Sequence, residues 1–186
     1  MKKIALVLFL ALFLVVGVSS ASMAQVPGYW DIKGAIDFGG EADIDGYGDT
    51  DVESGFTLVG EYKVPYTSEW TFGGGVQYQL DRDLDDNGLN DSLNFVPFYA
   101  LAHYNMQNSP YYFLGHLGYN SFDMDNTSDT SGGMYYAVGA GMDLSNNMSA
   151  ELMYSVNNGE ADGFRGSGNN VDVEYSKLTV SLGYQF

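Results

Sequence analysis

Along this chain, apolar side chains alternate with small or polar ones in eight separate segments. The clearest case is the last nine residues, where apolar groups occupy positions 178, 180, 182, 184 and 186. A repeat of two residues is typical of a β-strand with one apolar face. The eight segments cover approximately residues 30–39, 54–64, 70–80, 93–104, 111–121, 135–144, 148–156 and 178–186. The pattern therefore predicts an all-β protein.

Two segments depart from strict alternation. In the fourth segment both faces are apolar, and Pro97 has no N–H to donate to a neighbouring strand, so we expect a bulge or a local kink there. In the eighth, Val173 and Tyr175 fall on the opposite face from Leu178 and the residues after it. We expect either a bulge near Ser176 and Lys177 or a strand that begins at that point.

The connectors between segments alternate in length. Those at residues 65–68, 105–110 and 145–147 are short, whereas those at 40–53, 81–92, 122–133 and 157–171 are long. This rhythm predicts tight turns at one end of the molecule and long loops at the other. With an even number of strands, both ends of the protein domain fall on the side of the tight turns.

Alternation alone does not say whether the apolar face points inward, as in a soluble barrel, or outward into lipid. Aromatic side chains such as Trp30, Trp70 and Tyr184 lie near segment ends on the apolar face, which is typical of the two interfaces of a membrane. The opposite face carries mainly small residues. It has fewer charged residues than the exterior of a soluble protein normally has. Segments of about ten residues also match a tilted membrane strand. We therefore predict an eight-stranded antiparallel up-and-down transmembrane β-barrel, closed by pairing of its first and last strands.

The first 24 residues have the features of a secretory signal peptide. Lys2 and Lys3 precede an apolar run over residues 4–18, and Ser22–Ala24 offers the small residues that signal peptidase recognises. We expect cleavage after Ala24, with Ala21 as the alternative. A membrane anchor is a weaker reading, because the run is shorter than the ~20 residues that a spanning helix needs. The predicted organisation is a signal peptide at 1–24 and an outer-membrane barrel domain at 25–186.

Composition excludes several kinds of chemistry. The chain has no cysteine, which rules out disulfides, thiolate metal sites and cysteine nucleophiles. It has 24 acidic residues against seven basic ones, and two of the seven are in the predicted signal peptide. Because phosphate binding requires lysine and arginine, nucleic acid is not an expected partner. Most of the acidic residues fall in the long connectors.

A few charged residues lie on the polar face, which would line the barrel interior. They are Asp31, Lys33, Asp37, Glu61, Lys63, Asp143, Glu151 and Lys177. They could form an ion path or a plug of paired charges. We favour the plug, because an eight-stranded barrel has little free space inside and unpaired buried charges are costly. Lys33 and Glu61, on neighbouring strands, are the pair that we expect first.

One long connector contains a possible calcium loop. Asp83, Asp85, Asn87 and Asp91 supply oxygen atoms at alternate positions, with a glycine at the bend. The twelfth position is Asn94 rather than glutamate, and the flanking segments are strands rather than helices. An ordinary acidic turn is the simpler interpretation, and we assign no metal ion, cofactor or catalytic residue.

Two histidines raise the possibility of an enzyme. Catalysis by such a residue requires a nucleophile held beside the imidazole and a third group that orients it. No serine is adjacent to His103 in the sequence, and His103 falls toward the tight-turn end. His116 lies in mid-strand on the polar face, where we expect a hydrogen-bonding group inside the barrel.

The alternating segments resemble those of the small eight-stranded outer-membrane barrels of the OmpA and OmpX type. The resemblance rests on the terminal strand 178–186, the strand 110–119 and the hairpin 143–152. It implies an outer-membrane location, contact with lipid and lipopolysaccharide, short turns in the periplasm and recognition of the strand ending at Phe186 by the barrel-assembly machinery. The implied role is structural, adhesive or surface-interacting, through long acidic loops on a monomeric barrel. A narrow passage for small hydrophobic molecules is the first alternative, and a lipid A-modifying enzyme is the second.

The calcium loop can be tested by titration calorimetry. If the acidic connector is an ordinary turn, millimolar calcium will release no binding heat. A saturable signal that is lost in Asp85→Asn would contradict this expectation and assign the loop to calcium.

Overall fold

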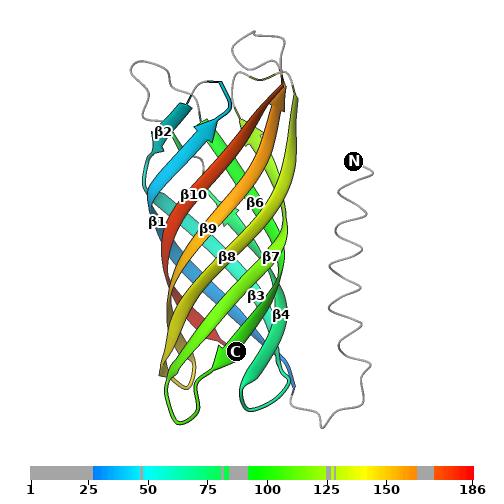
Figure 1. Ribbon diagram of the computed structural model, residues 1–186. Helices are drawn as coiled ribbons and strands as arrows, with labels where there is room; N and C mark the ends of the chain where they lie inside the picture. The colour runs from blue at the N-terminus through cyan, green and yellow to red at the C-terminus, as the bar shows by residue number, and fades with distance from the viewer. Residues whose placement is uncertain are drawn as a thin grey trace.

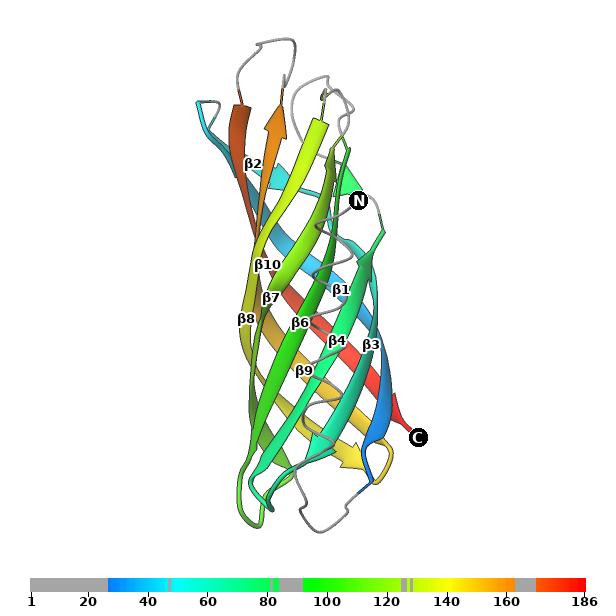
Figure 2. The same ribbon diagram turned by 90° about the vertical axis from the view of Figure 1, so that its right-hand side faces the viewer.

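The computed structural model describes residues 27–46, 48–80, 82–83, 92–124, 127, 129–162 and 170–186, which form one closed antiparallel sheet (Figures 1 and 2). Its eight long strands are β1 (Tyr29–Ile44), β3 (Gly55–Pro65), β4 (Trp70–Gln79), β6 (Ser92–Asn105), β7 (Tyr111–Met124), β8 (Asp129–Ser145), β9 (Met148–Asp162) and β10 (Asn170–Gln185). Two short strands are β2 (Gly48–Val52) and β5 (Arg82–Asp83). The predicted signal peptide lies outside the described residues. Among the described residues, no helix is long and apolar enough to cross a membrane.

Each long strand pairs with its neighbours along the chain, and the first strand also pairs with the last. The β1–β10 ladder runs from Asp31 opposite Gln185 to Ile44 opposite Val173. Short β2 pairs with β1, and β5 pairs with β6. Closure satisfies the backbone hydrogen bonds that lipid cannot satisfy. The predicted eight-stranded up-and-down barrel is confirmed.

The outer surface is apolar over most of the barrel. Large side chains such as Leu58 and Phe113 remain 61% and 55% exposed. Near the tight turns, the rings of Trp30 and Tyr62, and those of Trp70 and Tyr104, contact one another with centroids 5.1 Å apart in both pairs. The alternating strands thus turn their apolar faces outward, as predicted for a barrel in lipid.

The tight turns at residues 66–69, 106–110 and 146–147 lie together at the end of the barrel where the chain ends (Figure 1). That prediction is confirmed. The prediction of long loops at the opposite end is wrong in part, because the strands continue into them. β1 extends to Ile44 and is followed by β2, while β9 reaches Asp162 and β10 already begins at Asn170.

These extensions escaped the sequence pattern because their polarity is reversed. Val173 and Tyr175 point inward and are buried, whereas Asp172 and Glu174 point outward. The ladder between β9 and β10 is continuous from Asn170 to Tyr184. The expected bulge at Ser176 and Lys177 is therefore absent from this ladder, and the strand does not begin there. We call this part of the barrel, formed by strand residues 40–44, 48–52, 92–96, 122–124, 129–132, 157–162 and 170–175, the long-loop half.

The irregularity lies instead in the facing strand. The β1–β10 register shifts between Phe38 and Glu41, and both Phe38 and Gly39 are exposed on the outer surface. Gly39 has a φ of 59°, which is the left-handed region that glycine adopts without a steric penalty. This bulge lets β1 change from an apolar outer face to an acidic one.

Pro97 is accommodated without a bulge toward β7. It is buried, and it lies opposite Asn120 in an uninterrupted ladder. The β4–β6 ladder, however, reaches only as far as Phe98, the residue that follows the proline in the sequence. Both faces of β6 are apolar because Leu93 and Phe95 point into the barrel interior.

Inside the long-loop half, apolar side chains form a packed cluster that we call the apolar core. Phe95 stacks on Phe122 and on Tyr175, with centroid distances of 4.5 and 5.8 Å. The full set is Ala42, Ile44, Val52, Leu93, Phe95, Phe122, Met124, Ala161, Val171, Val173 and Tyr175. An apolar interior and an acidic exterior make this half suited to water, whereas the rest of the barrel is suited to lipid.

The bulge predicts a difference between two glycines on the same face of β1. A Cβ atom added to Gly39 or to Gly34 would meet nothing within 4 Å, but only Gly39 has a positive φ. We expect Gly39→Ala to lower the free energy of unfolding in lipid by about 1–2 kcal/mol. Gly34→Ala, the matched control, should leave it unchanged or slightly higher. Equal effects of both substitutions in denaturant titrations would contradict the role assigned to the bulge.

Candidate functional site

Five charged side chains meet inside the half of the barrel that carries the tight turns. Alternation along β1, β3 and β9 points all of them inward, and we call them the ionic cluster: Asp31, Lys33, Glu61, Lys63 and Glu151. The Lys33 ammonium lies 2.5 Å from Glu151 and 2.8 Å from Glu61. The Lys63 ammonium lies 2.6 Å from Asp31 and 3.1 Å from Glu61. The predicted pair of Lys33 and Glu61 is confirmed within a larger network.

Two tyrosines complete the hydrogen bonding of the glutamates. The Tyr99 hydroxyl donates to Glu61 Oε1 at 2.7 Å, and the Tyr112 hydroxyl donates to Glu151 Oε1 at 2.8 Å. Gly75 leaves room for this arrangement, because a Cβ atom there would approach the Glu61 side chain at 2.7 Å. Charge-assisted hydrogen bonds of this kind offset part of the cost of burying carboxylates.

Both histidines pack against tyrosine rings inside the barrel. His116 stacks on Tyr99 at a centroid distance of 4.2 Å, and its Nδ1 lies 3.3 Å from the Tyr135 hydroxyl. His103 stacks on Tyr112 at 5.0 Å. The expectation of a hydrogen-bonding His116 inside the barrel is confirmed. These contacts fit a packing and hydrogen-bonding role for the imidazoles.

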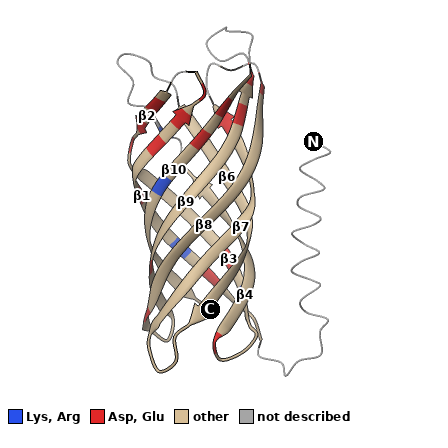
Figure 3. Ribbon diagram, in the orientation of Figure 1, with Lys and Arg blue, Asp and Glu red and all other residues tan. Residues whose placement is uncertain are grey.

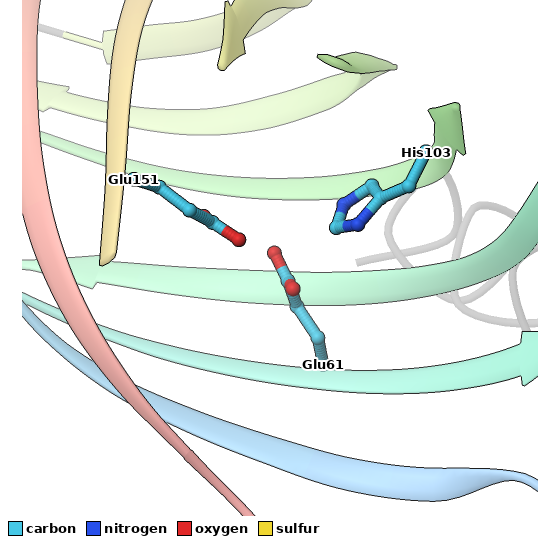
Figure 4. Close-up of side chains that lie close together, drawn as sticks. All are labelled: Glu61, His103 and Glu151. Atoms are coloured by element: carbon cyan, nitrogen blue, oxygen red, sulfur yellow. The ribbon is translucent and has the colours of Figure 1, made fainter. Parts of the chain in front are cut away.

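Glu61, His103 and Glu151 lie close enough to suggest a metal site. Their potential ligand atoms are within 4.8 Å of one another, and all three side chains are buried (Figure 4). The same carboxylates, however, are already in contact with the ammonium groups of Lys33 and Lys63. These cations compensate the carboxylate charge and would repel a divalent ion. We therefore interpret the group as part of the ionic cluster.

A second charged group lies around Asp37, nearer to the long-loop half. Lys177 contacts its carboxylate at 2.7 Å, and Arg82 contacts it at 2.9 Å. The hydroxyls of Thr57 and Thr179 donate to the same carboxylate at 2.5 and 2.7 Å. Arg82 reaches inward from β5 and also donates to the backbone carbonyl of Phe56 at 2.7 Å.

The two groups balance each other in charge. The ionic cluster has three carboxylates and two ammonium groups, whereas Asp37 has two cationic partners. In the described part of the chain, the buried acids are Asp31, Asp37, Glu61 and Glu151, and the buried lysines and arginines are Lys33, Lys63, Arg82 and Lys177. The interior is therefore close to neutral, and it contains every basic side chain of the described strands. The favoured reading, a plug of paired charges, fits this arrangement.

The exterior is correspondingly acidic, and Figure 3 shows the acidic residues gathered on the long-loop half. Of the remaining basic residues, Lys2 and Lys3 belong to the predicted signal peptide, and Arg165 lies outside the described residues. The exposed acids on strands of the long-loop half are Glu41, Asp43, Asp49, Asp51, Asp123, Asp129, Asp172 and Glu174.

Asp143 differs from the other residues expected inside the barrel. It is exposed, because it lies near the end of β8 at the tight turns. There it lines a cavity of about 590 Å³ together with Lys63, His103 and Tyr112. Asp143 therefore lies on the inward face, as its place in the alternation predicts, but it is exposed and forms no ion pair within the described residues.

The sequence analysis did not identify three residues that pair with the buried charges. Tyr99 and Tyr112 lie on the inward face by alternation, but the prediction of interior residues considered only charged side chains and histidines. Arg82 was assigned to a loop, although it directly follows a segment of regular alternation. Of the possible calcium ligands, Asp83 contributes its backbone to β5, whereas Asp85, Asn87 and Asp91 lie outside the described residues.

Comparisons with known proteins agree with this architecture. A family model described as the outer membrane protein beta-barrel domain matches residues 8–186. Among solved structures, Neisserial surface protein A has a TM-score of 0.59 at 12% identity, covering 86% of this chain and 99% of its own. Ail, the attachment invasion locus protein of Yersinia pestis, has a TM-score of 0.56 at 16% identity, covering 87% of this chain and 100% of its own. No curated protein matches in sequence. The expected family of small outer-membrane barrels is confirmed.

Removing one partner of the second charged group should be costly. Asp37→Asn leaves Lys177 and Arg82 buried without their carboxylate, and we expect the free energy of unfolding to fall by about 3–5 kcal/mol. The matched control is Asp43→Asn, on the same strand but exposed and opposite other carboxylates, which should not lower stability. Unfolding in lipid followed by tryptophan fluorescence measures both. A loss at Asp37 no larger than that at Asp43 would show that the buried pairing is dispensable.

Proposed function

Because the chain belongs to the outer membrane protein beta-barrel domain family, we propose that it acts at the cell surface, through contacts between the acidic long-loop half and molecules outside the cell. The observation that carries this proposal is the separation of charge between interior and exterior. Every lysine and arginine of the described strands is buried, so the exposed carboxylates of the long-loop half have no cationic partner on those strands. Such a surface attracts cationic groups over distances of about 8 Å at physiological ionic strength.

The filled interior supports a surface role over solute passage. Paired charges occupy the middle of the barrel, and the apolar core occupies the long-loop half. Ions crossing the barrel would have to separate the pairs and then pass stacked aromatic rings. We therefore favour surface contact over conduction.

The orientation and the assembly partners are part of the proposal. We place the tight turns in the periplasm and the long-loop half outside the cell, with lipid and lipopolysaccharide around the apolar belt of a monomeric barrel. Phe186 remains 64% exposed, and its backbone exchanges hydrogen bonds with Trp30 of β1. An exposed aromatic at the closing strand is suited to recognition by the barrel-assembly machinery.

A passage for small hydrophobic molecules is the second candidate, and one observation favours it. The β4–β6 ladder ends at Phe98, and the next paired residues are Arg82 and Leu93. The wall beside Pro97 thus has fewer inter-strand hydrogen bonds in the described residues than the rest of the sheet. A small apolar molecule could cross the wall at this place without passing the ionic cluster.

An enzymatic role has less support. His103 and His116 stack on tyrosines and lie beside the ionic cluster, as described above. A lipid A-modifying activity would require a nucleophile at one of these imidazoles, at a height reached by the acyl chains of the outer leaflet. We propose that the chain is not an enzyme, and lipid A mass spectra unchanged on overexpression are the corresponding expectation.

Cell attachment tests the surface role. Cells that display the protein should bind a surface coated with a basic protein. Replacing Glu41, Asp43, Asp172 and Glu174 by their amides should reduce this attachment about tenfold at low salt and less at high salt. The control replaces Glu69 and Asp143, at the tight-turn end, and should have no effect.

Two outcomes would contradict the proposal. Attachment that is the same for wild-type and neutralised protein would remove the acidic surface from consideration. Large, stable conductance steps of the purified protein in planar bilayers would show that the interior conducts ions and that the plug is wrong. Uptake of an apolar dye into vesicles, without conductance, would instead support the second candidate.

A further inference from the structure

The short strand β2 lies at the rim of the barrel and has one paired edge. Its residues Gly48–Val52 pair with Gly40–Ile44 of β1. In the described part of the chain, no strand pairs with the other edge of β2 (labelled in Figures 1 and 2), and the other short strand, β5, pairs with β6. A free edge presents backbone N–H and C=O groups that another extended segment can bind.

Carboxylates continue across this edge in cross-strand rows. Asp49 of β2 lies opposite Asp43 of β1, and Asp43 in turn lies opposite Glu174 of β10. A second row places Asp51 opposite Glu41. Like charges directly opposite each other destabilise a sheet, so the protein tolerates a repulsion here that amides or serines would remove.

Each row ends at the free edge of β2, with Asp49 and Asp51 both exposed and two residues apart. On an added strand, the residues opposite them would also be two residues apart and would share the outer face. Lysine or arginine at these two positions would relieve the repulsion in both rows. The described strands cannot supply such cations, because their basic side chains are buried.

We propose that the free edge of β2 binds an extended segment of a partner protein that carries basic residues at alternate positions. This inference rests on the proposed surface role and adds to it the kind of partner and the place of contact. Backbone hydrogen bonds along β2 hold the segment, and Asp49 and Asp51 select its basic side chains. The same carboxylates exclude a second copy of this chain, because its own β2 would place aspartate against aspartate.

Amide hydrogen exchange on the purified barrel, in non-ionic detergent micelles, tests the proposal. The probe is a short synthetic peptide in which lysine alternates with threonine or valine. We expect it to slow exchange by about tenfold at those amides of Gly48–Val52 that point away from β1, because the others already pair with β1. A peptide with the same lysines, but with proline at the alternate positions, keeps the charge and cannot form a ladder, so it should leave these amides unchanged.

A matched pair of variants separates strand addition from general attraction. Asp49→Asn with Asp51→Asn should weaken binding of the lysine peptide about tenfold. Asp123→Asn with Asp129→Asn makes the same charge change on β7 and β8, which pair with neither β1 nor β2, and should alter binding less than about twofold. Retained attachment of whole cells to basic surfaces, without peptide binding at β2, would refute this inference and leave the proposed function standing.

Three results would overturn the proposal. The first is protection, before any peptide is added, of the β2 amides that point away from β1, which would mean that the edge is already covered. The second is equal binding of the proline peptide. The third is equal loss of binding in the two double variants, because the acidic surface as a whole would then be responsible.

Discussion

The closed ladder between β1 and β10 is the constraint on which the rest of this molecule depends. Lipid offers no hydrogen-bond partner, so a sheet in a membrane must pair its first strand with its last. With eight strands, closure leaves an interior that side chains must fill. Away from the open end at the tight turns, the charged residues on the inward faces of the strands are consequently removed from water. The interior of this barrel is best understood as a small protein core with polar and apolar layers.

Burial then determines where the charges can lie. Four carboxylates inside the barrel need cations, and the described strands supply four. This use of lysine and arginine leaves the outer face of the described strands in the long-loop half without positive charge. The outer surface is therefore acidic because the basic side chains of these strands are paired inside the barrel. It also means that partners of this surface must bring their own cations.

The sequence predicted the strands, the tight turns, the closure and the pair of Lys33 and Glu61, because all of these follow from a repeat of two and from adjacency of strands. It failed where the same repeat carries the opposite polarity. Val173 and Tyr175 alternate as regularly as Leu182 and Tyr184, but they point inward. Periodicity assigns residues to two faces, and only the surrounding solvent decides which face is inside. Arg82 was missed for a related reason, since a charged residue after a strand resembles a loop residue until its inward direction is known.

The bulge at Gly39 has a consequence for how deeply the barrel sits in the bilayer. On one side of it, the outer face of β1 carries Ile36 and Phe38, and on the other side it carries Glu41 and Asp43. Sinking by a few ångströms would drive carboxylates into hydrocarbon, and rising would expose aromatic rings to water. The position along the membrane normal is thus restricted from both directions. Because the position of the barrel along the membrane normal is restricted, the rim strand β2 lies at a constant distance from the lipid headgroups.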